Sequence, residues 1–258
     1  MPTPLAVLAL WATVNLAEEA PAREAAPAAA PADVRFAEVD RAYDRRDEPG
    51  ELEKLKAGLA AAEQEGPADY ELEWRLARLY SWLSDDPAIS DDEKSKLGKI
   101  GWEHAEKAIA LDPSRVEGWH FAAVDMGQYS LGIGILKALS QGIEGKFKDR
   151  LSHAEKIDPG YSGGAIPTAW GRFWFKLPWP KYDGKKSERA LQAALKLNPD
   201  NVRARVYLAD LYEKEDEPAK ARAELERAAA GEPGRYDAPE ERRFQAMARQ
   251  KLARTEKR

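Results

Sequence analysis

The sequence contains no cysteine, and this absence excludes several kinds of chemistry at once. Disulfide bonds, thiolate metal sites, cysteine nucleophiles and a lipid-modified N-terminal cysteine all need that residue. The three histidines, His104, His120 and His153, are far apart and show no HExxH or HxxxH spacing. Neither a GxSxG elbow nor a dinucleotide glycine fingerprint occurs. We therefore expect no enzymatic activity, no metal site and no cofactor.

The chain also lacks a basic excess and a long hydrophobic run. Its net charge of −5 and pI near 5.5 argue against nucleic-acid binding. The longest apolar stretch, Leu5 to Leu16, is 12 residues long. This is too short for an ordinary transmembrane helix, so we expect no stable membrane span.

The apolar stretch instead suits the core of a secretory signal. Ala20-Pro21-Ala22 supplies small residues at cleavage spacing, so residues 1–22 are a candidate signal peptide. Residues 23–32, rich in alanine and proline, are predicted to be a linker. We expect a periplasmic or secreted protein, and the alternative is a cytoplasmic protein with an uncleaved hydrophobic N-terminus.

β-Branched residues are scarce, whereas alanine, leucine, glutamate, lysine and arginine are abundant, which favours helices from residue 33 onward. In Val202–Pro233, apolar residues recur at helical spacing on two successive segments. Alanines 209, 221 and 228 permit close approach of the two helices, and Tyr212 and Leu225 fill the gap between them. Pro199 and Pro233 lie 34 residues apart, and this unit resembles the tetratricopeptide repeat, whose period is the same.

Earlier copies of the unit follow from the same spacing. Pro113, Pro159 and Pro199 each end a helix, at separations of 46 and 40 residues, which implies insertions of 12 and 6 residues. Ser90 with Glu93 and Asp237 with Glu240 are capping-box patterns. Residues 33–258 are therefore predicted to form an all-α, tetratricopeptide-like α-solenoid of about five antiparallel helix pairs, with a charged C-terminal capping helix.

Two segments depart from a plain repeat. The first is GRFWFKLPWPKYDGKK, Gly171 to Lys186, where we expect Trp170 and Trp174 to be mainly core residues because they recur at helical spacing. Pro178 and Pro180 must end the helix, and Trp179 between them either covers a groove or seals the helix pair.

The second segment, Ser130 to Arg150, has glycines at 132, 134, 142 and 145. Glycine weakens a helix, so we expect compensation through close approach of another helix or of a ligand, with helix packing favoured.

These two segments, together with AEKIDPGYSGGA, resemble one branch of the tetratricopeptide superfamily. That branch includes the periplasmic T-component associated with TRAP transporters, and the regulators of microtubule dynamics are similar to it. The resemblance covers about Glu71 to Pro233. It implies an exported solenoid that can form homo-oligomers, contacts a solute-binding protein and holds an apolar ligand in a pore. Those relatives are typically lipoproteins, whereas this chain lacks cysteine.

A concave face lined by the first helices of the pairs is the natural binding surface of such a solenoid. We expect Tyr129 and Trp179 to supply flat apolar contact there, and Lys137 and Arg172 either to hold an anion or to extend into solvent. The remaining candidates are His120 and Gly134. The function we predict is protein–protein interaction through this face, by an exported, non-catalytic protein. The alternative is a carrier of a small apolar or anionic ligand beside the glycines, as a transporter-associated component.

Overall fold

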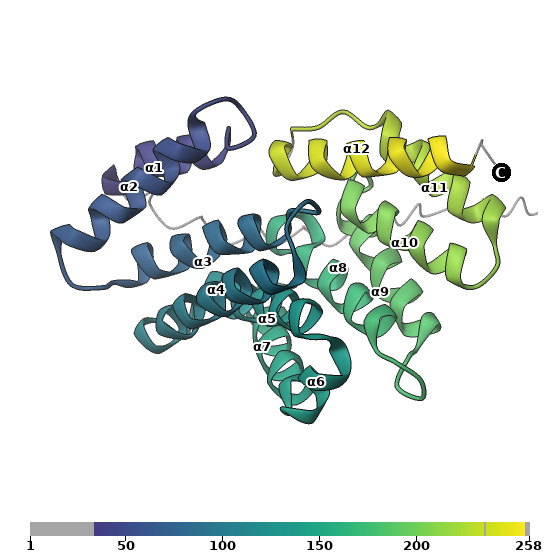
Figure 1. The fold of residues 1–258 in the computed structure, drawn as a ribbon, viewed down its shortest axis with the longest axis horizontal. Coiled ribbons are helices and arrows are strands. Elements are labelled where there is room, and N and C mark those ends of the chain that lie inside the picture. Colours follow the sequence, from purple (N-terminus) through teal and green to yellow (C-terminus); the bar gives the residue numbers. More distant parts are fainter. Residues whose placement is uncertain (1–33, 235, 256–258) are drawn as a thin grey trace, which may run out of the picture. The chain divides into compact units, whose positions relative to one another are not determined.

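The computed structural model describes residues 34–234 and 236–255. The predicted signal peptide and the linker, residues 1–22 and 23–32, lie outside the described residues. Across the part described, the chain is all-helical and forms a tetratricopeptide-like solenoid (Figure 1). None of the described helices combines the length and hydrophobicity that a bilayer-spanning segment needs.

The helices pack as consecutive antiparallel pairs, as the repeat pattern predicts. Each pair joins a first helix to a second one, and α12 caps the C-terminal end. The pairs are α1 (Ala37–Tyr43) with α2 (Glu51–Glu65), α3 (Tyr70–Ser84) with α4 (Asp91–Leu111), α5 (Val116–Ile133) with α7 (Ile143–Ile157), α8 (Tyr161–Lys176) with α9 (Gly184–Leu197), and α10 (Val202–Lys214) with α11 (Pro218–Ala230), followed by α12 (Ala238–Thr255).

Alanine and leucine at the predicted positions make the contacts between paired helices. Ala77, Ala105, Ala108, Ala209 and the other alanines of the repeat pattern have almost no exposed surface. Small side chains let helix axes approach closely, and the larger leucines fill the remaining space. Both predicted caps form, because Ser90 accepts a hydrogen bond from the amide of Glu93 and Asp237 accepts one from the amide of Glu240.

The insertion of 12 residues appears as a short extra helix, α6 (Ile135–Ser140), between α5 and α7. The glycines around it have different roles. A Cβ on Gly132 would lie 2.5 Å from the carbonyl oxygen of Asp91 and 2.6 Å from the amide of Ser95, so this glycine serves close packing of α5 on α4. Gly134, at φ +89°, instead breaks the helix, and a Cβ placed on it would have nothing within 4 Å. Close approach therefore explains Gly132 and not Gly134.

The aromatic stretch on α8 lies at the border of the core. Trp170 and Trp174 are half-buried and stack on each other with ring centroids 6.4 Å apart. The expectation that they are mainly core residues is thus only partly met, because Trp170 packs against the core while both rings also border a shallow groove between α8 and α9. Pro178 and Pro180 follow the end of the helix at Lys176, as predicted.

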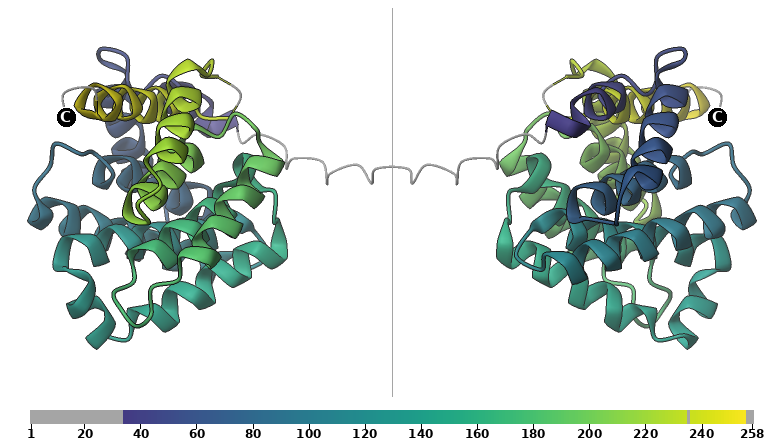
Figure 2. Two further views of the ribbon diagram at one scale, coloured as in Figure 1. Left: turned by 90° about the vertical axis from the view of Figure 1, so that its right-hand side faces the viewer. Right: turned by 90° about the vertical axis from the view of Figure 1, so that its left-hand side faces the viewer.

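The C-terminal helix also reaches the N-terminal pairs, and polar side chains make this closure. Arg46 donates two hydrogen bonds to the carboxylate of Asp237, at 2.6 and 2.7 Å, and Arg242 pairs with Asp47 at 2.6 Å. Arg243 donates to the main-chain carbonyl of Trp82 at 3.0 Å. The side views show α12 beside the N-terminal helices (Figure 2). The inner faces of the first helices consequently surround a common space.

Candidate functional site

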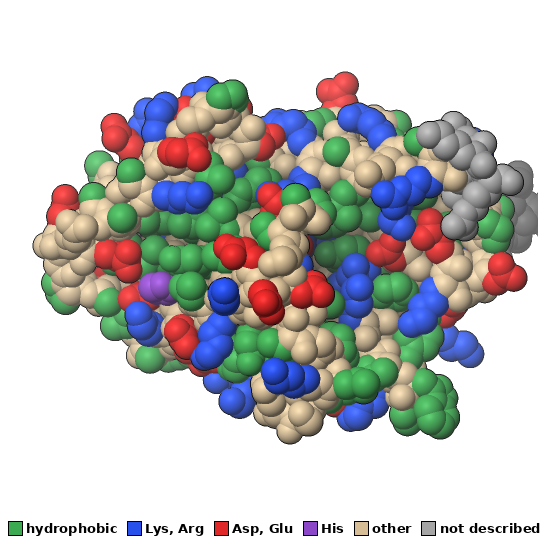
Figure 3. All heavy atoms as spheres, viewed as in Figure 1, with side chains coloured by type: hydrophobic (Ala, Val, Ile, Leu, Met, Phe, Trp, Pro, Cys, Tyr) green, Lys and Arg blue, Asp and Glu red, His purple; other side chains and the backbone are tan. Residues whose placement is uncertain are grey.

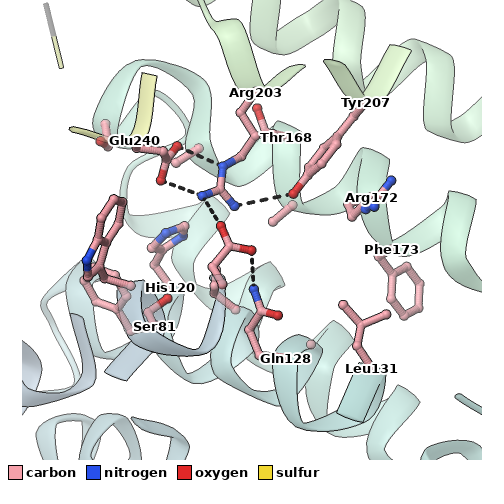
Figure 4. A pocket seen from close by; sticks show the side chains of 18 of the residues that line it. Ser81, His120, Gln128, Leu131, Thr168, Arg172, Phe173, Arg203, Tyr207 and Glu240 are labelled. Atoms are coloured by element: carbon pink, nitrogen blue, oxygen red, sulfur yellow. Dashed lines mark hydrogen bonds and ion pairs between the residues drawn. The ribbon is translucent and has the colours of Figure 1, made fainter. Parts of the chain in front are cut away.

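A cavity of about 470 Å³ lies inside the solenoid, between the first helices of the pairs. Side chains of α3, α5, α8, α10 and α12 line it (Figure 4). Residues of α6 and α7 line one end. Ligand pockets in proteins are typically about 300–1,000 Å³. The concave face that the repeat predicts is therefore present as a site of the size that a small molecule or a short peptide segment needs.

One end of the cavity is apolar. Phe147 of α7 and Phe173 of α8 stack there with ring centroids 4.7 Å apart. Leu131, Ile135 and Leu139, at the end of α5 and on α6, complete this wall. Such a surface favours burial of a hydrocarbon or aromatic group, since apolar area is removed from water on binding.

The other end is organised around Arg203, on the first turn of α10. Its guanidinium lies 2.8 Å from Asp85 and 2.7 Å from Glu240, and it donates to the hydroxyl of Tyr207 at 3.4 Å (Figure 4). Burial opposes the charge of Arg203, but Asp85 and Glu240 outweigh it and raise the pKa of the guanidinium. Gln128 donates to the second oxygen of Asp85 at 2.7 Å. These charges are thus satisfied within the protein and hold the wall in place.

Four buried side-chain atoms of the cavity wall have no hydrogen-bond partner within the described residues. Two are the Nε atoms of Arg46 and Arg78, whose terminal nitrogens are held in ion pairs. The other pair is Nδ1 of His120 and Oε1 of Gln128, whose residues are 7% and 6% exposed. Burial, together with Arg203, lowers the pKa of His120 to about 3, so its ring is neutral near pH 7. Since buried polar atoms in proteins are nearly always hydrogen-bonded, this pair offers a donor or acceptor position to a bound group.

Cations line a third part of the wall. Arg172 is paired with Asp210 at 2.7 Å, whereas Lys176, one turn further along α8, has no carboxylate partner among the described residues. Burial and the neighbouring Arg172 lower the pKa of Lys176 to about 8, despite the opposing charge of Asp210. Burial also lowers the pKa of Lys94, which donates to the main-chain carbonyl of Ser84. An anionic group would relieve the mutual repulsion of these cations.

The structure brings together only two of the six residues predicted from the sequence. His120 and Arg172 line the cavity. Tyr129 packs on Trp102 on the outer side of α5 and donates to Gln141. Gly134, Lys137 and Trp179 lie outside the cavity wall, and Lys137 and Trp179 are exposed.

Sequence reasoning missed Arg203, Asp85, Gln128 and Lys176 as lining residues. Nothing in the local pattern distinguishes them from solvent-facing residues of an amphipathic helix or loop, because their partners come from distant repeats. Asp85 and Arg203, for example, are 118 positions apart. Glu240 appeared only as part of a capping pattern, and its side chain turns inward to Arg203.

No three histidine, aspartate or glutamate side chains gather as a metal site within residues 34–234 and 236–255. The histidines lie in different surroundings. His104 contacts Glu73 at 2.6 Å, and His153 stacks on Trp119 at 4.3 Å. In the cavity wall, Asp85 is engaged by Arg203 and Gln128, and Glu240 is engaged by Arg203.

Comparison with known proteins agrees with this architecture. The family model described as regulator of microtubule dynamics protein 1-3 matches residues 35–176, and a tetratricopeptide repeat model matches residues 183–246. Among solved structures, a thermophilic tetratricopeptide protein of Thermus thermophilus is similar, with a TM-score of 0.63 and 19% identity. The similarity covers 85% of this chain and 99% of that chain. No curated protein matches the sequence.

Proposed function

This chain belongs to the family of the regulator of microtubule dynamics proteins 1-3, and from this premise we propose that it is a non-catalytic binding protein that encloses a small ligand in its central cavity. The cavity of about 470 Å³ is the single observation that carries the proposal, because side chains from several helix pairs and from α12 surround it. Tetratricopeptide folds generally mediate binding. At one end of this cavity, Arg203 is held in ion pairs with Asp85 and Glu240.

The three parts of the wall define the chemistry of the ligand. An apolar portion would lie between Leu139 and the Phe147–Phe173 pair. An anionic group would lie near Lys176, a half-buried cation without a carboxylate partner among the described residues. A neutral polar group would reach His120. The ligand is therefore a compact molecule with an apolar body and one anionic end.

Anilinonaphthalene sulfonate, an apolar anion, is a suitable probe, and its fluorescence reports binding in a dry site. Lys176→Met should weaken its binding about tenfold through loss of a charged partner. Leu139→Trp should weaken it as well by filling the apolar end. Lys196→Met is the matched control, since Lys196 is exposed outside the cavity. Unchanged binding in both cavity variants, with native circular dichroism, would contradict the proposal.

A protein partner is the second candidate function, because tetratricopeptide folds generally mediate protein–protein interaction. The resemblance to the TRAP T-component suggests a solute-binding protein as that partner. Native mass spectrometry of the full protein from its own host distinguishes the two candidates. A retained small molecule supports the first and a copurified protein the second. Leu139→Trp should remove the small molecule and leave a partner on an outer surface in place.

Export remains a proposal supported by residues 1–22 alone. Intact-mass measurement of the mature protein checks it. Cleavage after Ala22 should leave a chain beginning at Arg23, whereas retention of Met1 to Ala22 would indicate the cytoplasmic alternative.

A further inference from the structure

Two large apolar side chains are exposed at one edge of the solenoid, outside the cavity wall. Leu136 of α6 is 74% exposed, and Trp179 in the α8–α9 loop is 89% exposed. Lys181 of that loop lies 2.6 Å from Glu144 at the start of α7, directly after α6. Both side views also place α6 and the loop at the same lower edge (Figure 2). We call α6 and residues 177–183 together the docking edge.

The fold presents both side chains on fixed backbone. Main-chain hydrogen bonds hold the loop, because Lys181 and Tyr182 both donate to the carbonyl of Pro178, at 2.8 and 3.0 Å. On α6, Ala138 is buried and the cavity wall takes Ile135 and Leu139, so the opposite face carries Leu136 outward. Single exposed apolar residues are common on proteins, but here two lie at one edge, each on supported backbone.

The charge beside these residues is positive. Lys137 and Lys185 are exposed and have no carboxylate partner within the described residues, and Lys181 is exposed as well. The nearby carboxylates are already engaged. Glu144 pairs with Lys148 and Lys181, and Asp183 caps α9. Hydrophobic and basic side chains accordingly dominate the lower edge of the molecule (Figure 3), although the whole chain is acidic.

We propose that the docking edge binds an anionic lipid surface. Tryptophan favours the membrane–water interface, where its ring is apolar and its N–H stays hydrated. Lysines flanking exposed apolar residues are attracted to anionic headgroups. A second copy of this chain is disfavoured as the occupant, since two such edges would place Lys137 and Lys185 of each copy against like charges.

Docking in this way would bring the apolar end of the cavity close to the bilayer. Ile135, Ala138 and Leu139 line the cavity from the same short helix that carries Leu136. The lipid-binding edge does not depend on the cavity ligand, and either proposal can fail alone.

Vesicle flotation of the full chain tests the edge. Wild type should float with phosphatidylcholine vesicles that contain about 30% phosphatidylglycerol, and little with pure phosphatidylcholine. The double variant Leu136→Ala/Trp179→Ala should bind about tenfold more weakly, as should Lys137→Glu/Lys185→Glu. Both pairs are exposed, so the thermal midpoint should stay unchanged.

The matched control residues lie on α7 and α9, at the ends of these helices that are far from the docking edge. Ile157 and Leu197 are 40% and 48% exposed, at the C-terminal ends of α7 and α9, beside Lys156 and Lys196. Ile157→Ala/Leu197→Ala and Lys156→Glu/Lys196→Glu should bind vesicles as wild type does. Equal weakening by the controls, or undiminished binding of the edge variants, overturns the proposal. The proposal is also overturned if the edge variants lose self-association in analytical ultracentrifugation while their vesicle binding stays unchanged.

Discussion

Replacement of His120 should reduce the loss of folding stability that the protein shows when the pH is lowered from 7 to 5. His120 is 7% exposed, with its ring about 5.1 Å from the rings of Phe121 and Tyr161. Burial and the positive charge of Arg203 lower the pKa of His120 to about 3. In the unfolded chain a histidine has a pKa of about 6.5. Between these two pH values, His120 is therefore protonated in the unfolded state and neutral in the folded state.

The sign and size of the effect follow from this difference. Because the unfolded state binds more protons, stability falls as the pH decreases below about 6.5. Each pH unit costs about 1.4 kcal/mol, so His120 alone should remove about 2 kcal/mol between pH 7 and pH 5. With a urea m-value of about 2 kcal/mol/M, the unfolding midpoint shifts by roughly 1 M.

Urea unfolding of wild type and His120→Gln at pH 7 and pH 5 measures this contribution. The variant cannot take up the proton, so its loss of stability should be smaller by about 2 kcal/mol. Other titrating groups are common to both proteins and cancel in the comparison. His153→Gln is the control, since the side chain of His153 is 42% exposed. An identical pH dependence in wild type and His120→Gln would refute the reasoning, as would an equal effect of the control.

Three further perturbations test the packing and the closure. Gly132→Ala should destabilise the fold by about 1–3 kcal/mol through clash with α4, whereas Gly145→Ala, with open space around it, should stabilise it by up to about 1 kcal/mol in denaturant titrations. Burial raises the pKa of Asp125 well above its usual range, so Asp125→Asn should raise the thermal midpoint at pH 7 more than at pH 3, where the unfolded carboxyl is also largely protonated. Arg46→Ala should cost about 3 kcal/mol, and a double-mutant cycle with Asp237→Ala should show coupling; additive effects would contradict a direct closing contact.

The repeat architecture was predictable because its determinants are local. Alanine spacing in Val202–Pro233 identifies the surfaces of two helices, and prolines 113, 159 and 199 mark where pairs end. The insertion between Pro113 and Pro159 was predictable in length, and the structure shows it as α6. Burial of Ala209 confirms the packing inferred from its size.

The functional residues were less predictable, for a physical reason that differs from residue to residue. Trp179 attracted attention as an aromatic residue between prolines, but its exposure depends on how the α8–α9 loop leaves the core. Arg172 and His120 were identified, although their neighbours were not. Trp170 and Trp174 follow helical spacing, yet their stacked rings stop at the surface because no further helix among the described residues covers them.

The sequence alone therefore determined the helices, their pairing and the absence of cysteine chemistry, since each depends on contacts within about one repeat or on composition. Only the tertiary structure decided that the concave face forms a cavity of about 470 Å³. Arg203 meets Asp85 and Glu240 from distant repeats, and Arg46 joins Asp237 across the closure. Small rotations between successive pairs accumulate along a solenoid, and their sum places these groups together without any local signature.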